Sequence, residues 1–244
     1  RARMKNAQNL SSLNTMKVGL CPTYFQHRLL PQWAAERTHV IHDGIDCKSL
    51  KPNHITRLEV PKCKDNANEI LFKPGDPIIT FINRTFEPYR GIHIFLEALI
   101  DLQSRDKEVQ VILVGKNTPH VSYGKHREDG NGWLTALRKK HGDALDWNRI
   151  HALGTVSHKV LKCIYQVSAV HVYLSYPFVL SWSMLEAMSS GCLVVGSDTE
   201  PVREVIKHGQ NGLLVPFKNA KELSNTLLWA LKSQNKTNFM KFFD

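Results

Sequence analysis

The chain has 244 residues, of which 42% are hydrophobic, and this composition excludes a globally disordered polypeptide. Its formal net charge of +10 favours a polyanionic partner: a phosphate-bearing small molecule, an anionic membrane surface or nucleic acid. Nucleic acid is the least favoured of the three, because the basic residues are scattered and no RNA-binding or helix-turn-helix signature occurs. No apolar run approaches the length of a membrane span.

Residues 1–75 show weak periodicity. Residues 16–20 predict a short strand, residues 24–30 a helix, and residues 38–46 a strand followed by a turn at Asp43-Gly44. Residues 47–75 are rich in Lys, Asn and Pro and carry no period, so they predict a connecting arm.

From Asp76 onward, apolar strand-like runs alternate regularly with amphipathic helical patterns. Strands are predicted over residues 77–82, 109–114, 150–153, 169–174, 193–196 and 213–215. A helix is predicted after each strand, and the last one begins at a capping box, Asn219 to Glu222. This alternation predicts an α/β fold with a doubly wound, parallel, six-stranded Rossmann-like sheet.

The most informative stretch is residues 168–217, which reads as strand, loop, helix and strand. Pro177 ends the strand, Ser181 is a good N-cap for the helix, and Gly191 is its stop signal. Glu186 lies within this helix, where an isolated glutamate is usually exposed to solvent. The loop before the helix lies at the carboxyl end of a parallel strand, where open α/β sheets bind ligands.

The residues after this loop carry a resemblance to a known family. They are 185–198 (LEAMSSGCLVVGSD), 200–206 (EPVREVI) and 208–215 (HGQNGLLV). Their order resembles the carboxyl-terminal donor-binding domain of family 4 retaining glycosyltransferases, the group 1 type with the GT-B fold. The resemblance implies a hexosyltransferase-like enzyme that needs no metal and no cofactor beyond its nucleotide-diphosphate-sugar donor. It also implies that Glu186 hydrogen-bonds the ribose hydroxyls of that donor.

The same resemblance suggests a domain organisation. Residues 1–40 are expected to be a remnant of an amino-terminal Rossmann-like domain with the interdomain crossing, and residues 41–75 a linker arm. Residues 76–232 are expected to form the nucleotide-sugar-binding Rossmann-like domain, and residues 233–244 a truncated carboxyl-terminal segment. We therefore expect this chain to bind donor but, as an isolated fragment without the amino-terminal domain, to transfer no sugar.

Two arginines follow the first strand of the sheet, in residues 83–91 (NRTFEPYRG). If the strand order is 3-2-1-4-5-6, the loops after strands one and four face each other at the topological switch point. Arg84 and Arg90 would then oppose the helix of Glu186, and this arrangement suits a pyrophosphate. The resemblance agrees, although the family usually has Lys where this chain has Arg90. The alternative interpretation is a salt-bridged loop, with Glu87 as the partner.

Further donor contacts are expected from two loops. Residues 178–181 would form the sugar and phosphate loop, and Gly154 and Val156 belong to the loop that faces the base in the family. The four residues of the first loop are Phe178, Val179, Leu180 and Ser181. The family usually has another Glu, seven residues before the one at Glu186, where this chain has Phe178. Its loss indicates either an inactive site or, as we expect, a site in which Phe178 contacts the sugar by its apolar ring. Residues 122–124 either touch the acceptor or cap a long polar loop.

The spacing of the cysteines indicates the redox state of the compartment in which the protein works. They are dispersed without paired spacing, which indicates free thiols in a reducing, cytoplasmic environment. They are Cys21, Cys47, Cys63, Cys163 and Cys192. His39 and His42 lack further ligands nearby in sequence, so no metal site is expected. Peripheral attachment to the inner face of an anionic membrane remains an alternative location.

A non-catalytic nucleotide-sugar-binding module is the alternative function. The sequence leaves the base, the sugar and the acceptor open, and the acceptor is a glycan, a lipid or a protein.

Overall fold

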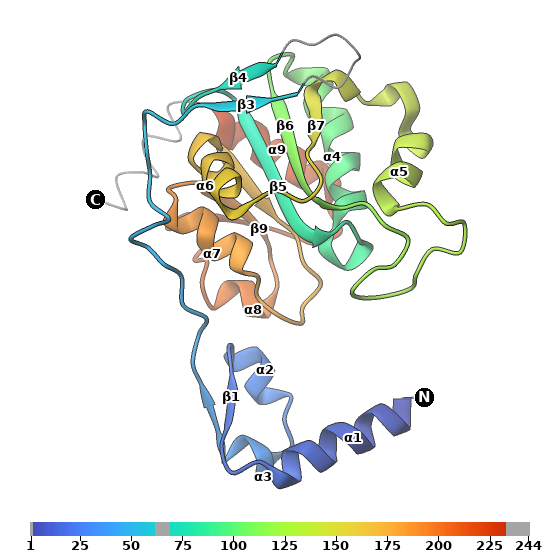
Figure 1. Cartoon of the computed structure of the whole chain (residues 1–244), viewed down its shortest axis with the longest axis vertical. Coiled ribbons are helices and arrows are strands. Elements are labelled where there is room, and N and C mark those ends of the chain that lie inside the picture. Colours follow the sequence, from blue (N-terminus) through green and yellow to red (C-terminus); the bar gives the residue numbers. More distant parts are fainter. Residues whose placement is uncertain (1, 62–68, 233–244) are drawn as a thin grey trace.

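The computed structural model describes residues 2–61 and 69–232, so Cys63 and the segment 233–244 lie outside the described residues. Figure 1 shows a small amino-terminal lobe joined by an extended strap to a larger α/β domain. The lobe comprises α1 (Ala2–Thr15), β1 (Gly19–Cys21), α2 (Tyr24–Arg28), α3 (Gln32–Ala35) and β2 (Thr38–Val40). Strands β1 and β2 pair in parallel. The sequence pattern indicated β1, α2 and β2 but not α1 and α3.

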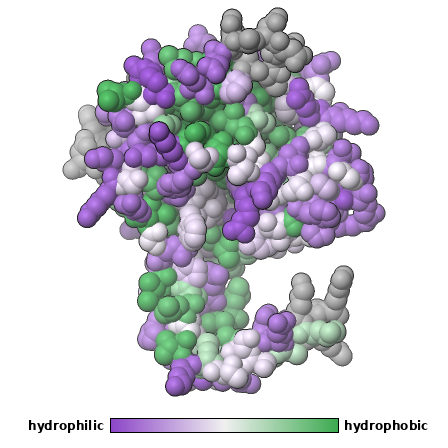
Figure 2. Space-filling model, viewed as in Figure 1, coloured by the Kyte–Doolittle hydropathy of each residue, from purple (hydrophilic) through white to green (hydrophobic). Residues whose placement is uncertain are grey.

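The lobe contacts the domain through α2. The backbone N–H groups of Tyr24 and Phe25 donate to the carboxylate of Glu204, at 2.8 and 2.6 Å. Figure 2 shows hydrophobic residues on the surface of the lobe, and the exposed ones include Val18 and Leu20.

The larger domain is built on a six-stranded parallel sheet with the order β7-β6-β5-β8-β9-β10. The strands are β5 (Ile78–Thr85), β6 (Gln110–Lys116), β7 (Ile150–Ala152), β8 (Val170–Tyr173), β9 (Leu193–Ser197) and β10 (Leu213–Val215). In chain order of the six strands this is 3-2-1-4-5-6, so the predicted doubly wound Rossmann-like topology is confirmed.

Helices connect the strands. They are η1 (Pro88–Arg90), α4 (Ile92–Arg105), α5 (Trp133–His141), η2 (Gly142–Ala144), η3 (Trp147–Arg149), α6 (His158–Val167), α7 (Trp182–Ser189), α8 (Glu200–Arg203) and α9 (Ala220–Leu231). The six α-helices among these lie close to where the sequence predicted them, whereas the three 3-10 turns η1, η2 and η3 were not predicted. None of the described helices is long and apolar enough to cross a membrane.

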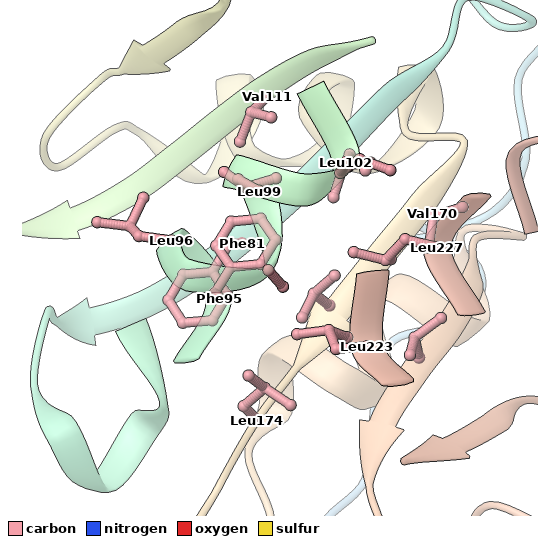
Figure 3. Packing of buried hydrophobic residues seen from close by; sticks show 14 of the residues in the cluster. Phe81, Phe95, Leu96, Leu99, Leu102, Val111, Val170, Leu174, Leu223 and Leu227 are labelled. Atoms are coloured by element: carbon pink, nitrogen blue, oxygen red, sulfur yellow. The ribbon is translucent and has the colours of Figure 1, made fainter. Parts of the chain in front are cut away.

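Two hydrophobic cores cover the two faces of the sheet, because successive side chains of a strand point to opposite faces. On one face α4 and α9 pack over Phe81, whose ring stacks on that of Phe95 at 4.8 Å between centroids. Figure 3 shows this packing, with Leu223 and Leu227 of α9 beside the strands. On the other face Ile78 and Ile82 of β5 belong to the core that buries residues of α6 and α7.

The segment expected to be a connecting arm contains regular structure that the sequence pattern missed. Strand β3 (Leu58–Val60) pairs antiparallel with β4 (Ile70–Phe72). Leu58, Val60 and Phe72 are buried in the second core, together with Leu50. The prediction of an arm without elements is therefore wrong for this part. Strands of three residues are too short to show a period, and tertiary packing stabilises them here.

Asn219 is the N-cap of α9, as the sequence predicted. Its Oδ1 accepts from the backbone N–H of Glu222 at 3.0 Å, and its Nδ2 donates to the Glu222 carboxylate at 2.9 Å. We expect Asn219→Ala to lower the free energy of unfolding by about 0.5–2 kcal/mol, because an N–H group at the start of the helix loses its acceptor. Urea denaturation measures this, and an unchanged midpoint would contradict the capping role.

Candidate functional site

Two adjoining pockets, of about 260 and 240 Å³, lie where β5 and β8 end. These strands are neighbours at the switch point of the sheet, so their following loops meet there. Asn83, Arg84 and Ser181 line both pockets. The first pocket is completed by Thr85, Glu87, Arg90, Ser122, Tyr123, Val179, Leu180 and Trp182. The second is completed by Ile82, Val114, Gly115, Lys116, Thr155, Val156, Leu161, Tyr165, Ser183 and Glu186.

Glu186 lies in the wall of the second pocket, and its side chain is only 14% exposed. The Tyr165 hydroxyl donates to Glu186 Oε2 at 3.0 Å, and His158 Nε2 lies 3.5 Å from Oε1. Burial and the neighbouring carboxylate both raise the pKa of Tyr165, so its hydroxyl keeps the proton that it donates. Glu186 is therefore a fixed acceptor facing a cavity and not an ordinary glutamate on a solvated helix.

Arg90 lies in the wall of the first pocket and is held by neutral groups. Its Nη1 lies 3.1 Å from the Tyr173 hydroxyl and 3.2 Å from Ser175 Oγ, and donates to both. The guanidinium carbon lies 4.6 Å from the centroid of the Phe178 ring and 5.7 Å from that of Tyr123. Cation–π contacts of this kind fix the cation without neutralising it.

Gly91 ends the turn that carries Arg90, with φ at +72°. A Cβ there would lie 2.5 Å from Cβ of Leu174, the residue after β8, so this close approach requires glycine. The turn thereby holds Arg90 next to Tyr173, the last residue of β8.

Arg84 is exposed and lies where the two pockets join. Within residues 2–61 and 69–232, neither Arg84 nor Arg90 forms an ion pair with a carboxylate. The alternative of a loop salt-bridged to Glu87 is therefore not what the structure has. The Glu87 carboxylate instead accepts from the backbone N–H of Tyr123, at 3.0 Å.

The loop before α7 brings three of its four expected residues, Val179, Leu180 and Ser181, to the first pocket. Ser181 lines the first pocket and caps α7 by accepting from the backbone N–H of Ser183, so the amino-terminal end of the helix, with its positive dipole end, lies at the pocket. Phe178 lies beside the pocket rather than in its wall, with its ring against Arg90 and 4.6 Å from the Tyr123 ring.

The loop that was expected to face the base is also only partly in a pocket wall. Val156 and Thr155 line the second pocket, whereas Gly154 holds the loop to β6 by accepting from the N–H of Gly115 at 2.9 Å. Wall residues to which the sequence analysis gave no ligand-binding role include Tyr165, Trp182 and Glu87, the last having been considered only as an ion-pair partner. Ser122 and Tyr123, left open between two roles, both line the first pocket.

Two family models match the chain. Residues 64–241 match the glycosyl transferases group 1, and residues 1–50 match the glycosyl transferase family 4 group. Among curated relatives, spore coat protein SA of Bacillus subtilis (strain 168) is 25% identical over 209 residues, which are 83% of this chain and 52% of that protein. The phosphatidyl-myo-inositol mannosyltransferase of Mycolicibacterium smegmatis is 28% identical over 159 residues, 63% of this chain and 36% of the relative. The chain thus spans about half, or less, of the length of these relatives.

Solved structures share the fold. Anabaena HepE in complex with UDP and glucose has a TM-score of 0.68 at 19% identity, covering 92% of this chain and 56% of that one. The C-terminal domain of a glycosyl transferase group 1 family protein, LpcC of Francisella tularensis, has a TM-score of 0.62 at 19% identity, covering 80% of this chain and 92% of that one. The first family model matches more than half of the chain, which therefore belongs to the glycosyl transferases group 1 family.

Proposed function

We propose that the two pockets bind a nucleotide-diphosphate sugar and that the chain is the donor-binding half of a retaining, metal-independent hexosyltransferase. The observation that carries this proposal is the distribution of charge. One pocket holds Arg90 without a paired carboxylate, the adjoining pocket holds the fixed acceptor Glu186, and Arg84 lies between them. A nucleoside diphosphate offers the complementary order, with hydroxyls on its ribose and negative charge on its phosphates. A structural neighbour, HepE, is described in complex with UDP-glucose.

Each residue has a role under this proposal. Glu186 accepts hydrogen bonds from the ribose hydroxyls, and the backbone around Val156 faces the base. Arg84 and Arg90 bind the pyrophosphate, together with N–H groups at the start of α7. As the bond to the sugar breaks, negative charge grows on the pyrophosphate, and these cations and dipoles stabilise it. The pyrophosphate oxygen can also accept the proton of the acceptor hydroxyl. No described group of three or more His, Cys, Asp or Glu residues could hold a metal ion.

Nucleotide binding by the 244-residue chain tests the proposal. We expect UDP, GDP or ADP to raise the melting temperature, because a ligand that binds only the folded state stabilises it. At a concentration 100 times the Kd, the gain is about 2.7 kcal/mol, or roughly 5–10 °C for a chain of this size. If none of the three shifts the transition, the donor-binding proposal is wrong. An assay of sugar release or transfer from the donor by the whole protein then distinguishes the two functions: an enzyme releases or transfers the sugar, and a non-catalytic binding module does neither.

A further inference from the structure

Glu87 is the least expected residue in the wall of the first pocket. It is the second residue after β5 and immediately precedes η1, and it is 2% exposed. Its side chain makes no cap for η1, and its hydrogen bond is with the backbone N–H of Tyr123, which Oε2 accepts. In the part of the chain that the structure describes, no cation pairs with Glu87 and its Oε1 has no hydrogen-bond partner.

A buried carboxylate with a single neutral donor is unfavourable, because one hydrogen bond does not replace its lost hydration. If Glu87 had a structural role, an ion pair with an arginine would stabilise it better. Arg84 and Arg90 line the same pocket, yet neither forms an ion pair with Glu87. The pocket therefore offers two unpaired cations and one half-satisfied carboxylate. A ligand that satisfies both kinds of group carries negative charge at one end and hydrogen-bond donors, such as hydroxyl groups, close by.

The negative charge of Glu87 also determines the orientation of a bound ligand in the pocket. A phosphate beside Glu87 would be repelled, so the phosphates of a ligand must lie against the arginines and neutral hydroxyls against Glu87. Position 178 offers no competing acceptor, because Phe178 is apolar and packs on Arg90. Tyr123 contacts both charged residues: its backbone N–H donates to Glu87, and its ring lies against the guanidinium of Arg90.

We propose that Glu87 accepts hydrogen bonds from hydroxyl groups of the sugar that is attached to the diphosphate, and so selects hydroxylated donor sugars. This inference rests on the proposed function, and it assigns the sugar subsite of the same pocket to the loop after β5. Phe178 has a different task in this arrangement: it positions Arg90 and does not bind the sugar itself.

The test is Glu87→Gln in the 244-residue chain, with binding measured by calorimetry for two matched pairs of probes, UDP with UDP-glucose and GDP with GDP-mannose. Glutamine keeps an oxygen for the Tyr123 N–H but loses the charge. We expect the nucleotide sugar to bind about tenfold more weakly, because its hydroxyls meet a neutral acceptor. The free diphosphate should bind equally well or more tightly, because a like charge has been removed from its pocket.

A loss confined to the nucleotide sugar separates this role from a merely structural one, which would weaken both probes together. Glu97→Gln is the matched control: it removes the same charge from an exposed position on α4 and should change neither affinity. Equal losses for both probes in Glu87→Gln, or an unchanged affinity for the nucleotide sugar, overturn the inference alone. A wild-type chain that binds none of UDP, GDP and ADP overturns it together with the proposed function.

Discussion

Arg90→Ala is expected to weaken the binding of a nucleoside diphosphate by about a hundredfold, the loss of two charge-assisted hydrogen bonds of about 1.5 kcal/mol each. Nη1 of Arg90 is occupied by Tyr173 and Ser175, and Phe178 and Tyr123 lie against the guanidinium. These neighbours hold the cation in place before the ligand arrives, so little conformational entropy is lost on binding. The free nucleoside, which lacks phosphates, should bind the variant as well as it binds the wild type.

Calorimetry with UDP and uridine, or with GDP and guanosine, measures the two affinities. Arg90→Lys should fall between wild type and Arg90→Ala, since it keeps the charge but cannot make a forked contact. Arg138→Ala removes the same charge from an exposed position on α5 and serves as the control. Arg84→Ala should show the same selectivity for the phosphates as Arg90→Ala. Equal losses for nucleoside and diphosphate would mean that the substitution disturbs the fold rather than a phosphate contact.

The topology, and the meeting of the candidate site residues at one edge of the sheet, could be predicted because each depends on a rule that acts along the chain. Parallel strands joined by helices form right-handed crossovers, so the alternation from Asp76 onward leaves few strand orders. The carboxyl ends of β5 and β8 then bring Arg84, Arg90 and the helix of Glu186 to one place. The short strands β3 and β4 could not be predicted in this way, because they are stabilised by packing on the second core and not by a pattern in the local sequence.

The finer contacts of the site depend on side-chain directions and on the path of one loop, which no local pattern encodes. Residues 117–132 connect β6 to α5, and only the folded loop brings the N–H of Tyr123 to Glu87. Phe178 lies in the loop that was expected, but its ring turns to Arg90. For the same reason the sequence offered Glu87 only as a partner for the arginines, whereas the fold buries it in the wall of the first pocket.

Glu186→Ala is expected to weaken nucleotide binding by roughly ten- to a hundredfold, because hydrogen bonds to a charged acceptor contribute about 1.5–3 kcal/mol. The Tyr165 hydroxyl fixes the carboxylate at the wall of the second pocket, so the ribose meets an acceptor that is already oriented. Removing the 2′-hydroxyl from the ligand should abolish the same hydrogen bond, so its effect on affinity and that of Glu186→Ala should not add. The wild type should bind UDP more tightly than 2′-deoxy-UDP, and Glu186→Ala should bind the two almost equally.

This comparison of two nucleotides in two proteins isolates the contact between Glu186 and the ribose, because any general damage to the pocket affects both ligands. Tyr165→Phe tests how the carboxylate is held. It removes the donor to Oε2 while leaving Glu186 charged, so discrimination between UDP and 2′-deoxy-UDP should fall but not vanish. Glu97→Ala, on the exposed face of α4, should leave discrimination intact. If Glu186→Ala still distinguishes the two nucleotides as well as the wild type does, Glu186 does not bind the 2′-hydroxyl, and its contact with Tyr165 serves the packing of α6 against α7 instead.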